Sequence, residues 1–299
     1  MRLITAGCGQ YLAPSPPRLH RMIYRWIKGR GCSLIVAVVP AMNEAGRISR
    51  VLNELLKLPV AAIICVVNGS HDQTLEEATS LKNNRVKALH FKEPLGIDLP
   101  RAVGAKFALD LGAQKALFVD GDMIGISQKS LAGLCKTLDQ GVDMALTNCY
   151  PGATHRYSFA NRVLYFRHLL NETTGIFSQV GLASPAHGPH AVSRRLLLQV
   201  PLAELAIPPV AMVMALQAGL SIGLGAIIPH LDLASAVRNS GHGEKVGDTL
   251  IGDCLEAIHL WRGEPRKRSW GGYQFLGYHP MRRWDLLEGV MHQPPSFID

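Results

Sequence analysis

The sequence predicts an α/β fold with a mostly parallel, doubly wound sheet and flanking helices. Apolar runs of strand length recur at 33–39, 60–67, 86–91, 116–119 and 142–147. These runs are continuous rather than alternating, which is typical of strands buried on both faces. Helical patterns separate them, and strands that alternate with helices indicate parallel βαβ units.

Each helix expected in the first half follows one of these strands. At 48–56 one helix face is apolar, and further helices are expected within 96–112 and at 127–139. After about residue 150 we expect a long basic helix at 157–172, a buried helix near 210–218, a strand near 220–228 and a last helix at 244–260. The uncharged stretch 205–229 has the length of a membrane span, but proline and glycine interrupt it, which favours the buried helix and strand.

The composition indicates a folded protein with an anionic partner. Of 299 residues, 47% are hydrophobic and 18% are charged, and the formal net charge is +8. This charge suits a nucleotide, a phosphorylated acceptor, a membrane surface or a nucleic acid, without choosing among them. The six cysteines are scattered and form no C-x-x-C pair. Because residues 1–10 also lack the pattern of a secretory signal, we expect a reducing, cytoplasmic setting.

The stretch Asp120-Gly121-Asp122 directly follows a buried strand. Ligands of open α/β sheets bind beyond the carboxyl ends of the strands. Two carboxylates there, with a glycine that lets the backbone turn, make an oxygen site for a divalent cation that can hold a diphosphate. An ordinary solvated turn of the same composition is the alternative.

Two other turns leave strands in the same direction, at 40–44 and 68–72. Since parallel strands end at one edge of the sheet, all three turns should line one crevice. There Asn43 or Glu44 can accept hydrogen bonds from a ribose or a base, and Asn68 and Ser70 can pair with a base edge. The metal interpretation of the two acids gains support from this shared position.

The three turns together carry a family resemblance. P-A-x-N-E after the first strand, V-V-N-G-S-x-D-x-T after the second and D-G-D after the fourth resemble a nucleotide-sugar glycosyltransferase of the GT-A fold, similar to family 2. The resemblance implies that Mg²⁺ or Mn²⁺ bridges the donor diphosphate, with Asp122 as principal ligand and catalytic residue beside Asp120. The nucleotide-sugar site implied comprises Pro40, Ala41, Asn43, Glu44, Asn68, Gly69, Ser70, Arg101, Asp120 and Gly121.

The second half resembles the glucosyl-3-phosphoglycerate synthases. Residues 184–201 resemble their acceptor loop with its paired arginines, and 161–163 their acceptor-phosphate helix. Residues 231–239 resemble their H-R-N turn, although Val237 stands at the histidine, so that His242 or His230 is expected to complete the metal site. The acceptor residues implied are Arg162, Gly188, His190 and Asn239, and the catalytic arginines are Arg194, Arg195 and Arg238.

These comparisons divide the chain into four expected segments: a basic extension at 1–32, a nucleotide-sugar-binding half at 33–150, an acceptor-binding half at 151–261 and a tail at 262–299. No acid occurs at 206–217, where an inverting transferase would need a base on the acceptor. Its absence favours a retaining mechanism in which the leaving diphosphate helps to deprotonate the acceptor. Alternatively, the Arg194-Arg195 pair is solvated at the start of a helix and has no catalytic role.

The function expected is transfer of a sugar from a UDP-glucose-like donor to a small phosphorylated or carboxylated acceptor such as 3-phosphoglycerate. One alternative is transfer to a polyprenyl phosphate or other lipid, with the basic residues 18–30 on a membrane surface. Those residues can equally pack on a partner subunit or on their own domain. A non-catalytic nucleotide-sugar-binding protein is the third alternative.

Other classes fit less well. No G-x-G-x-x-G follows the first strand, which argues against a dehydrogenase. Nucleic-acid binding has only the charge and the stretch 266–270 in its favour, so we expect no nucleic-acid partner. The aromatic tail can hold a homodimer together.

Overall fold

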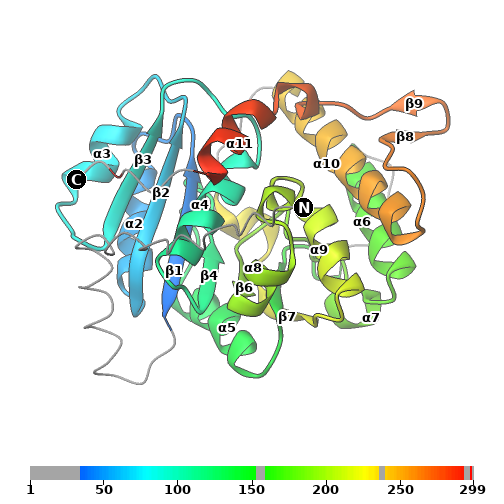
Figure 1. The fold of residues 1–299 in the computed structure, drawn as a ribbon, viewed down its shortest axis with the longest axis horizontal. Helices are drawn as coiled ribbons and strands as arrows, with labels where there is room; N and C mark the ends of the chain where they lie inside the picture. Colours follow the sequence, from blue (N-terminus) through cyan, green and yellow to red (C-terminus); the bar gives the residue numbers. More distant parts are fainter. Residues whose placement is uncertain (1–33, 153–158, 236–239, 293–296, 298–299) are drawn as a thin grey trace, which may run out of the picture. The chain divides into compact units, whose positions relative to one another are not determined.

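The computed structural model describes residues 34–152, 159–235, 240–292 and 297 (Figure 1). The predicted basic segment 18–30 therefore lies outside the described residues, as do Arg238 and Asn239. The chain from Ser33 onward forms one compact unit.

A seven-stranded sheet, in the order β3-β2-β1-β4-β6-β5-β7, organises this unit. Six of these strands run parallel and β6 alone is antiparallel to its neighbours β4 and β5. The predicted α/β class with a mostly parallel sheet is confirmed. The strands are β1 (Ile35–Ala41), β2 (Val60–Asn68), β3 (Val86–Phe91), β4 (Lys115–Phe118), β5 (Met144–Asn148), β6 (His190–Ser193) and β7 (Ile222–Ile227).

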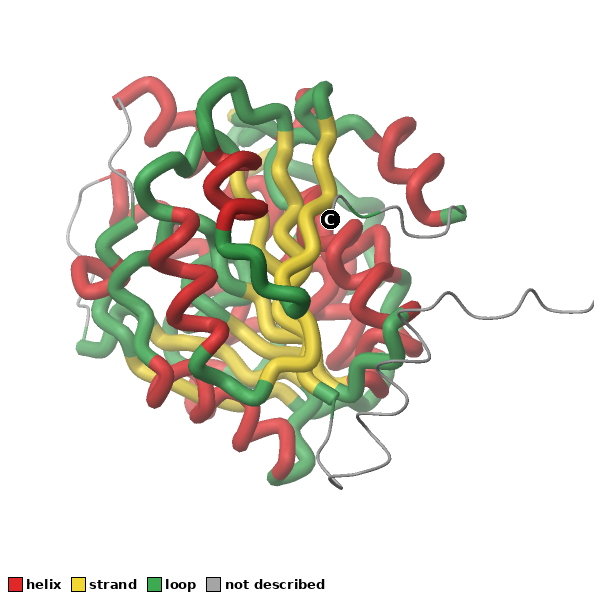
Figure 2. The backbone as a smooth tube through the Cα atoms, turned by 90° about the vertical axis from the view of Figure 1, so that its left-hand side faces the viewer, coloured by secondary structure: helices red, strands yellow, loops and turns green. Residues whose placement is uncertain are grey.

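Helices lie on both sides of the strands (Figure 2). They are α2 (Ile48–Leu56), α3 (Thr74–Ser80), α4 (Leu99–Asp110), α5 (Gln128–Asp139), α6 (Phe159–Thr173), α7 (Phe177–Val180), α8 (Arg194–Gln199), α9 (Pro208–Gln217), α10 (Ser240–Trp261) and α11 (Trp284–Met291). The 3₁₀ helices are η1 (Leu202–Ala206), η2 (His230–Leu233) and η3 (His279–Met281), and β8 (Ser269–Trp270) pairs with β9 (Tyr273–Gln274). No helix in the described residues has the length and apolarity to cross a membrane.

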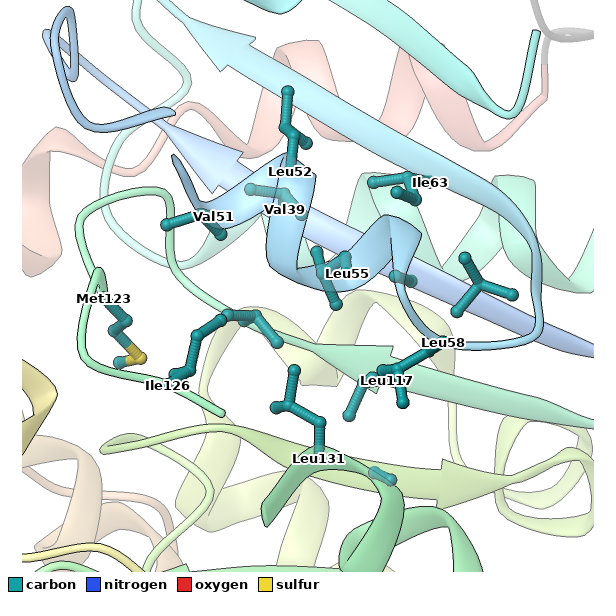
Figure 3. Close-up of a cluster of buried hydrophobic side chains, with 14 of the residues drawn as sticks. Val39, Val51, Leu52, Leu55, Leu58, Ile63, Leu117, Met123, Ile126 and Leu131 are labelled. Carbon is teal, nitrogen blue, oxygen red and sulfur yellow. The ribbon is translucent and has the colours of Figure 1, made fainter. Parts of the chain in front are cut away.

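One face of the sheet packs against α2 and α5. Val39 and Leu117 of the sheet meet Leu52 and Leu55 of α2 and Leu131 of α5, all of them buried (Figure 3). The opposite face packs against α4, where Gly104 is required because a Cβ atom would collide with Val38 Cγ1. The apolar spacing at 48–56 thus correctly predicts which side of α2 is buried, and the sheet is covered on both faces as its continuous apolar strands require.

Strand β6 is one of the elements that the sequence analysis missed. It has only four residues, His190–Ser193, and lies between β4 and β5. Its reversed direction matters for the site, since it begins where β4 and β5 end. His190 pairs with Phe118 at the carboxyl end of β4, whereas Ser193 pairs with Lys115 at its start.

Candidate active site

The turns after β1 and β2 hold each other at the carboxyl edge of the sheet. The backbone N–H of Asn43 donates to Ser70 Oγ over 3.1 Å, and that of His71 donates to Asn43 Oδ1 over 2.9 Å. The N–H of Glu44 donates to Thr74 Oγ1 over 2.7 Å. These bonds join residues about thirty positions apart, as expected of two turns that form one surface.

The side chain of Asn68 has a structural role at this edge. Its amide accepts a hydrogen bond from the N–H of Leu95 over 2.6 Å and donates to Gly96 O over 3.2 Å, which ties the loop before α4 to β2. Gly69 next to it has φ 63°, and a Cβ atom there would lie 2.8 Å from Pro94 Cβ. The predicted nucleotide-binding residues at this turn thus shape the backbone, because the Asn68 side chain already bonds within the chain.

The two acids lie beside the first turn. The N–H of Gly121 donates to Pro40 O over 2.9 Å, which joins the turn after β4 to the end of β1. A Cβ atom at position 121 would lie 3.0 Å from Ala41 Cβ, so the glycine permits this close approach. The structure thus brings Pro40, Ala41 and Gly121 together at the edge.

Asp120 and Asp122 have different environments. Asp120 Oδ1 accepts a 2.6 Å hydrogen bond from Nη2 of Arg101. Burial raises the pKa of Asp120, while the charge of Arg101 acts to lower it and that of Asp122 to raise it. Asp122 is partly exposed at the same turn. Both acids of the pair are therefore partly exposed, and Arg101 holds one oxygen of Asp120.

Arg101 belongs to a buried ion-pair chain that runs into the C-terminal tail. Its Nε donates to Asp98 Oδ1 over 2.9 Å, and Arg282 Nη2 lies 3.7 Å from Asp98 Oδ2. Arg282 also binds Asp253 through two hydrogen bonds of 2.9 and 2.8 Å. We use the name buried ion-pair chain for Asp120, Arg101, Asp98, Arg282, Asp253 and Arg268.

Near the end of this chain, Asp253, Glu256 and His279 are close enough to hold a metal ion. Guanidinium groups occupy the cluster instead. Arg268 Nη1 donates to Asp253 over 2.6 Å and to Glu256 over 3.0 Å. We therefore interpret this cluster as part of the ion-pair chain and not as a metal centre.

A second group at the carboxyl edge contains His230, a predicted candidate ligand, together with three residues that the sequence analysis did not single out. His187 Nε2 and His230 Nδ1 lie 3.1 Å apart, and the Tyr150 ring stacks on both imidazoles at 5.5 Å between centroids. The guanidinium carbon of the buried Arg167, on α6, lies 5.8 Å from the centre of the Tyr150 ring. Tyr150 and His230 each follow the end of a strand, the signal by which the first three turns were found. We call these four residues the histidine–arginine cluster.

The paired arginines lie at the opposite edge. Because β6 is antiparallel, it leads the chain away from the acids, and α8 begins beside the start of β4. Arg194 Nη1 donates to Ala113 O over 3.1 Å, and Arg195 Nη2 to Gly219 O over 3.3 Å. The structure therefore does not bring Arg194 and Arg195 to the acids, and their placement favours the alternative of a helix start.

The other predicted residues lie in different elements of the fold. Gly188, with φ 78°, packs against Cys149, and His190 is buried and stacks on Phe118 at 4.8 Å. Nδ1 of His190 has no hydrogen-bond partner in the described part of the chain. Arg162 is exposed on α6, and His242 Nδ1 lies 2.7 Å from the Tyr278 hydroxyl.

The stretch before the predicted H-R-N turn does approach the acids. The N–H of Gly125, three residues after Asp122, donates to Leu233 O of η2 over 3.0 Å. Leu233, in the stretch 231–239 that carries the resemblance, therefore lies beside the loop that carries the acids.

The comparison with protein families decides the assignment. The family model described as "Glycosyl transferase family 2" matches residues 36–200. This chain belongs to glycosyl transferase family 2. The match spans all three turns and both acids, and it confirms the predicted nucleotide-sugar glycosyltransferase. No curated protein sequence matches the chain.

Solved structures with this fold include glucosyl-3-phosphoglycerate synthase from Mycobacterium tuberculosis. Its complex with Mn²⁺, UDP-glucose and phosphoglyceric acid has a TM-score of 0.58 and 19% identity, over 85% of this chain and 87% of that chain. Its complex with Mn²⁺, UDP and glucosyl-3-phosphoglycerate has a TM-score of 0.57 and 19% identity, over 86% and 88%. A further mycobacterial protein has a TM-score of 0.55 and 19% identity, over 84% and 81%. The predicted GT-A fold and the resemblance in fold to these synthases are thereby confirmed.

Proposed function

We propose that this family 2 enzyme transfers a sugar, with retention of configuration, from a UDP-glucose-like donor to a small phosphorylated or carboxylated acceptor such as 3-phosphoglycerate. One observation carries the proposal. Asp120 and Asp122 follow β4 at the edge where the turns after β1 and β2 bind each other. This is the position at which open α/β sheets bind nucleotides.

In this proposal Mg²⁺ or Mn²⁺ binds at Asp122, with Asp120 as the second carboxylate. Carboxylate oxygens suit both ions, and Arg101 already holds one oxygen of Asp120, which favours Asp122 as principal ligand. When bound, the ion neutralises the diphosphate that leaves the sugar. Pro40, Ala41, Glu44 and the backbone of Gly69 would face the nucleoside.

The absence of a carboxylate base for the acceptor supports retention of configuration. Helix α9 carries no acidic residue. The nearest acid, Glu204, is bound by Arg266 Nη1 through two hydrogen bonds of 2.9 and 3.0 Å. Both oxygens of this carboxylate are therefore already engaged by a guanidinium, and we do not assign Glu204 as the base. The leaving diphosphate is then the group that takes the acceptor proton.

The donor and acceptor named here agree with the solved neighbours. The mycobacterial synthase binds UDP-glucose, Mn²⁺ and phosphoglyceric acid in one structure, and glycerol 3-phosphate in another. In our proposal residues 33–150 bind the donor, 151–261 bind the acceptor, and the tail 262–299 supplies a homodimer contact. Its exposed side chains, which include Trp270, Tyr273 and Trp284, suit such a contact.

Calorimetric titration of the chain with UDP, GDP and their glucose conjugates, with and without Mn²⁺, tests the donor site. We expect UDP to bind in a metal-dependent way and Asp122→Ala to abolish that dependence. Release of UDP on addition of 3-phosphoglycerate, with the product anomer read by NMR, tests the acceptor and the retention. Nucleotide binding that ignores metal and survives Asp122→Ala would refute the proposal.

A further inference from the structure

Four arginines are buried in the described residues: Arg101, Arg167, Arg268 and Arg282, which are 4%, 3%, 7% and 3% exposed. Three of them bind carboxylates within the buried ion-pair chain. Arg167 differs. No carboxylate lies within ion-pair distance of it among the described residues, which include every Asp and Glu of the sequence except Asp299.

A buried cation without a counter-charge is costly. Breaking a buried pair strongly destabilises a protein, because one charge remains uncompensated. Arg167 nevertheless stands in a buried position with the Tyr150 ring as its neighbour, and one cation–π contact offsets only part of this cost even when desolvated. Such a residue indicates an anion that arrives from outside the chain.

The surroundings of Arg167 are built to receive an anion. Burial lowers the pKa of His187 well below its ordinary value, and the charges of Arg167, His230 and Arg101 lower it further. Burial and the charge of Arg167 also lower the pKa of His230. Each neutral imidazole carries one ring N–H; one of the two joins His187 to His230, and the other can donate to an oxyanion without a charge of its own.

The cluster also lies beside the acids. The N–H of His230 donates to Cys149 O over 2.9 Å, which fixes η2 at the carboxyl end of β5. Arg101, which binds Asp120, is close enough to act electrostatically on His187. An anion held by Arg167 would therefore lie next to the proposed diphosphate and sugar position, and not at a remote surface.

We propose that Arg167, His187, His230 and Tyr150 form an oxyanion subsite that binds the phosphate or carboxylate of the acceptor. This inference rests on the proposed function and adds to it the residues that select an anionic acceptor. It assigns this selection to the buried Arg167 and not to Arg162, which lies exposed earlier on the same helix.

The test uses the full chain with UDP and Mn²⁺ present. Titration with 3-phosphoglycerate, glycerol 3-phosphate and inorganic phosphate should give affinities that fall at least tenfold in Arg167→Met. The affinity for UDP with Mn²⁺ should stay within twofold. Arg262→Gln removes the same charge from an exposed position outside the site, and it should leave all affinities within twofold.

Thermal unfolding without ligand separates a binding role from a structural one. Removal of an unpaired buried cation should leave the melting temperature unchanged or raise it, whereas removal of a structural arginine lowers it. A lowered melting temperature together with unchanged phosphate affinity would overturn the inference. His230→Gln alters an exposed ring without disturbing the core, and a threefold weaker affinity for phosphate is expected even if Arg167→Met fails to fold.

Two further outcomes are decisive. If UDP binds with Mn²⁺ but the wild-type chain binds none of the three anions, the subsite is refuted while the donor site stands. If Arg167→Met removes a preference for UDP-glucuronic acid over UDP-glucose and leaves the affinity for 3-phosphoglycerate unchanged, the oxyanion belongs to the donor sugar, and the acceptor assignment is wrong.

Discussion

Arg101 and Asp120 form a partly buried ion pair in which Nη2 donates to Oδ1 over 2.6 Å. The same guanidinium holds Asp98 through Nε over 2.9 Å. The two acids of the family 2 site therefore differ in their contact with Arg101 before any ligand binds. Arg101 of α4 holds Asp120, and both acids are partly exposed at the turn.

Arg101→Gln should destabilise the chain by about 2–4 kcal/mol, because Asp98 and Asp120, which are 10% and 28% exposed, lose their shared cation. Urea unfolding at pH 7 measures this change. Arg50→Gln, an exposed arginine on α2, is the control and should stay within about 0.5 kcal/mol of the wild type. If both variants unfold at the same urea concentration, the pair does not stabilise the fold.

Removal of the metal should affect the two acids differently. We expect EDTA to weaken UDP binding in the wild type and to have no effect on Asp122→Asn, since that variant has lost the principal ligand. Asp120→Asn should keep a weakened response to Mn²⁺, because one of its oxygens serves Arg101. Titration of UDP at several Mn²⁺ concentrations measures this. Equal losses in the two variants would contradict the inequality of the acids.

Arg195→Gln should leave transfer activity unchanged. Arg195 is exposed at the opposite edge of the sheet, where it bonds to Gly219 O. The stability change expected is within about 0.5 kcal/mol, as for most exposed substitutions. Steady-state rates with the donor and 3-phosphoglycerate check this, and a tenfold loss of kcat would restore the catalytic role that the sequence suggested.

The stability of the fold should depend on pH through His279. Burial, followed by the charges of Arg268 and Arg282, lowers the pKa of His279 from 6.5 to about 4. The unfolded chain therefore binds a proton between pH 6.5 and 4 that the folded chain does not, so stability falls as the pH falls through this range. His279 is partly exposed, and we expect a loss of about 1–2 kcal/mol after screening.

The pKa values of His187 and His190 are also lowered, so these residues add to the loss of wild-type stability at low pH. The variant His279→Gln isolates the contribution of His279. Urea unfolding at pH 7 and pH 4.5 should show a smaller loss in the variant than in the wild type. Parallel losses in the two proteins would exclude His279 as the origin.

Much of the fold follows from local signals. The strand at 86–91 has the predicted bounds, and Ser127 caps α5 with its side chain, directly before the helix. Strand β6 could not be found in this way. Its four residues have no apolar run of their own. They form a strand because β4 on one side and β5 on the other provide backbone hydrogen-bond partners.

The residues of the candidate site also fall into two groups, those that local sequence signals predict and those that they do not. The acids and the first two turns follow strand ends, so their meeting at one edge is a consequence of parallel topology. Arg167 has no such signal, because its role depends on the lack of a carboxylate among residues distant in sequence. The sequence analysis expected the Arg194-Arg195 pair near the acids. The direction of β6, which local signals do not reveal, decides which edge of the sheet the pair reaches.

The contact between Arg282 and Asp98 joins residues separated by most of the chain. The chain is synthesised from its N-terminus, so β1 to β4 are complete long before Arg282 is added. Until then Asp98, Arg101 and Asp120 form an unfinished set with two acids and one cation. The proposed donor half can reach its final electrostatic state only after Arg282 has been synthesised, so a residue far along the chain completes a site built from the first strands.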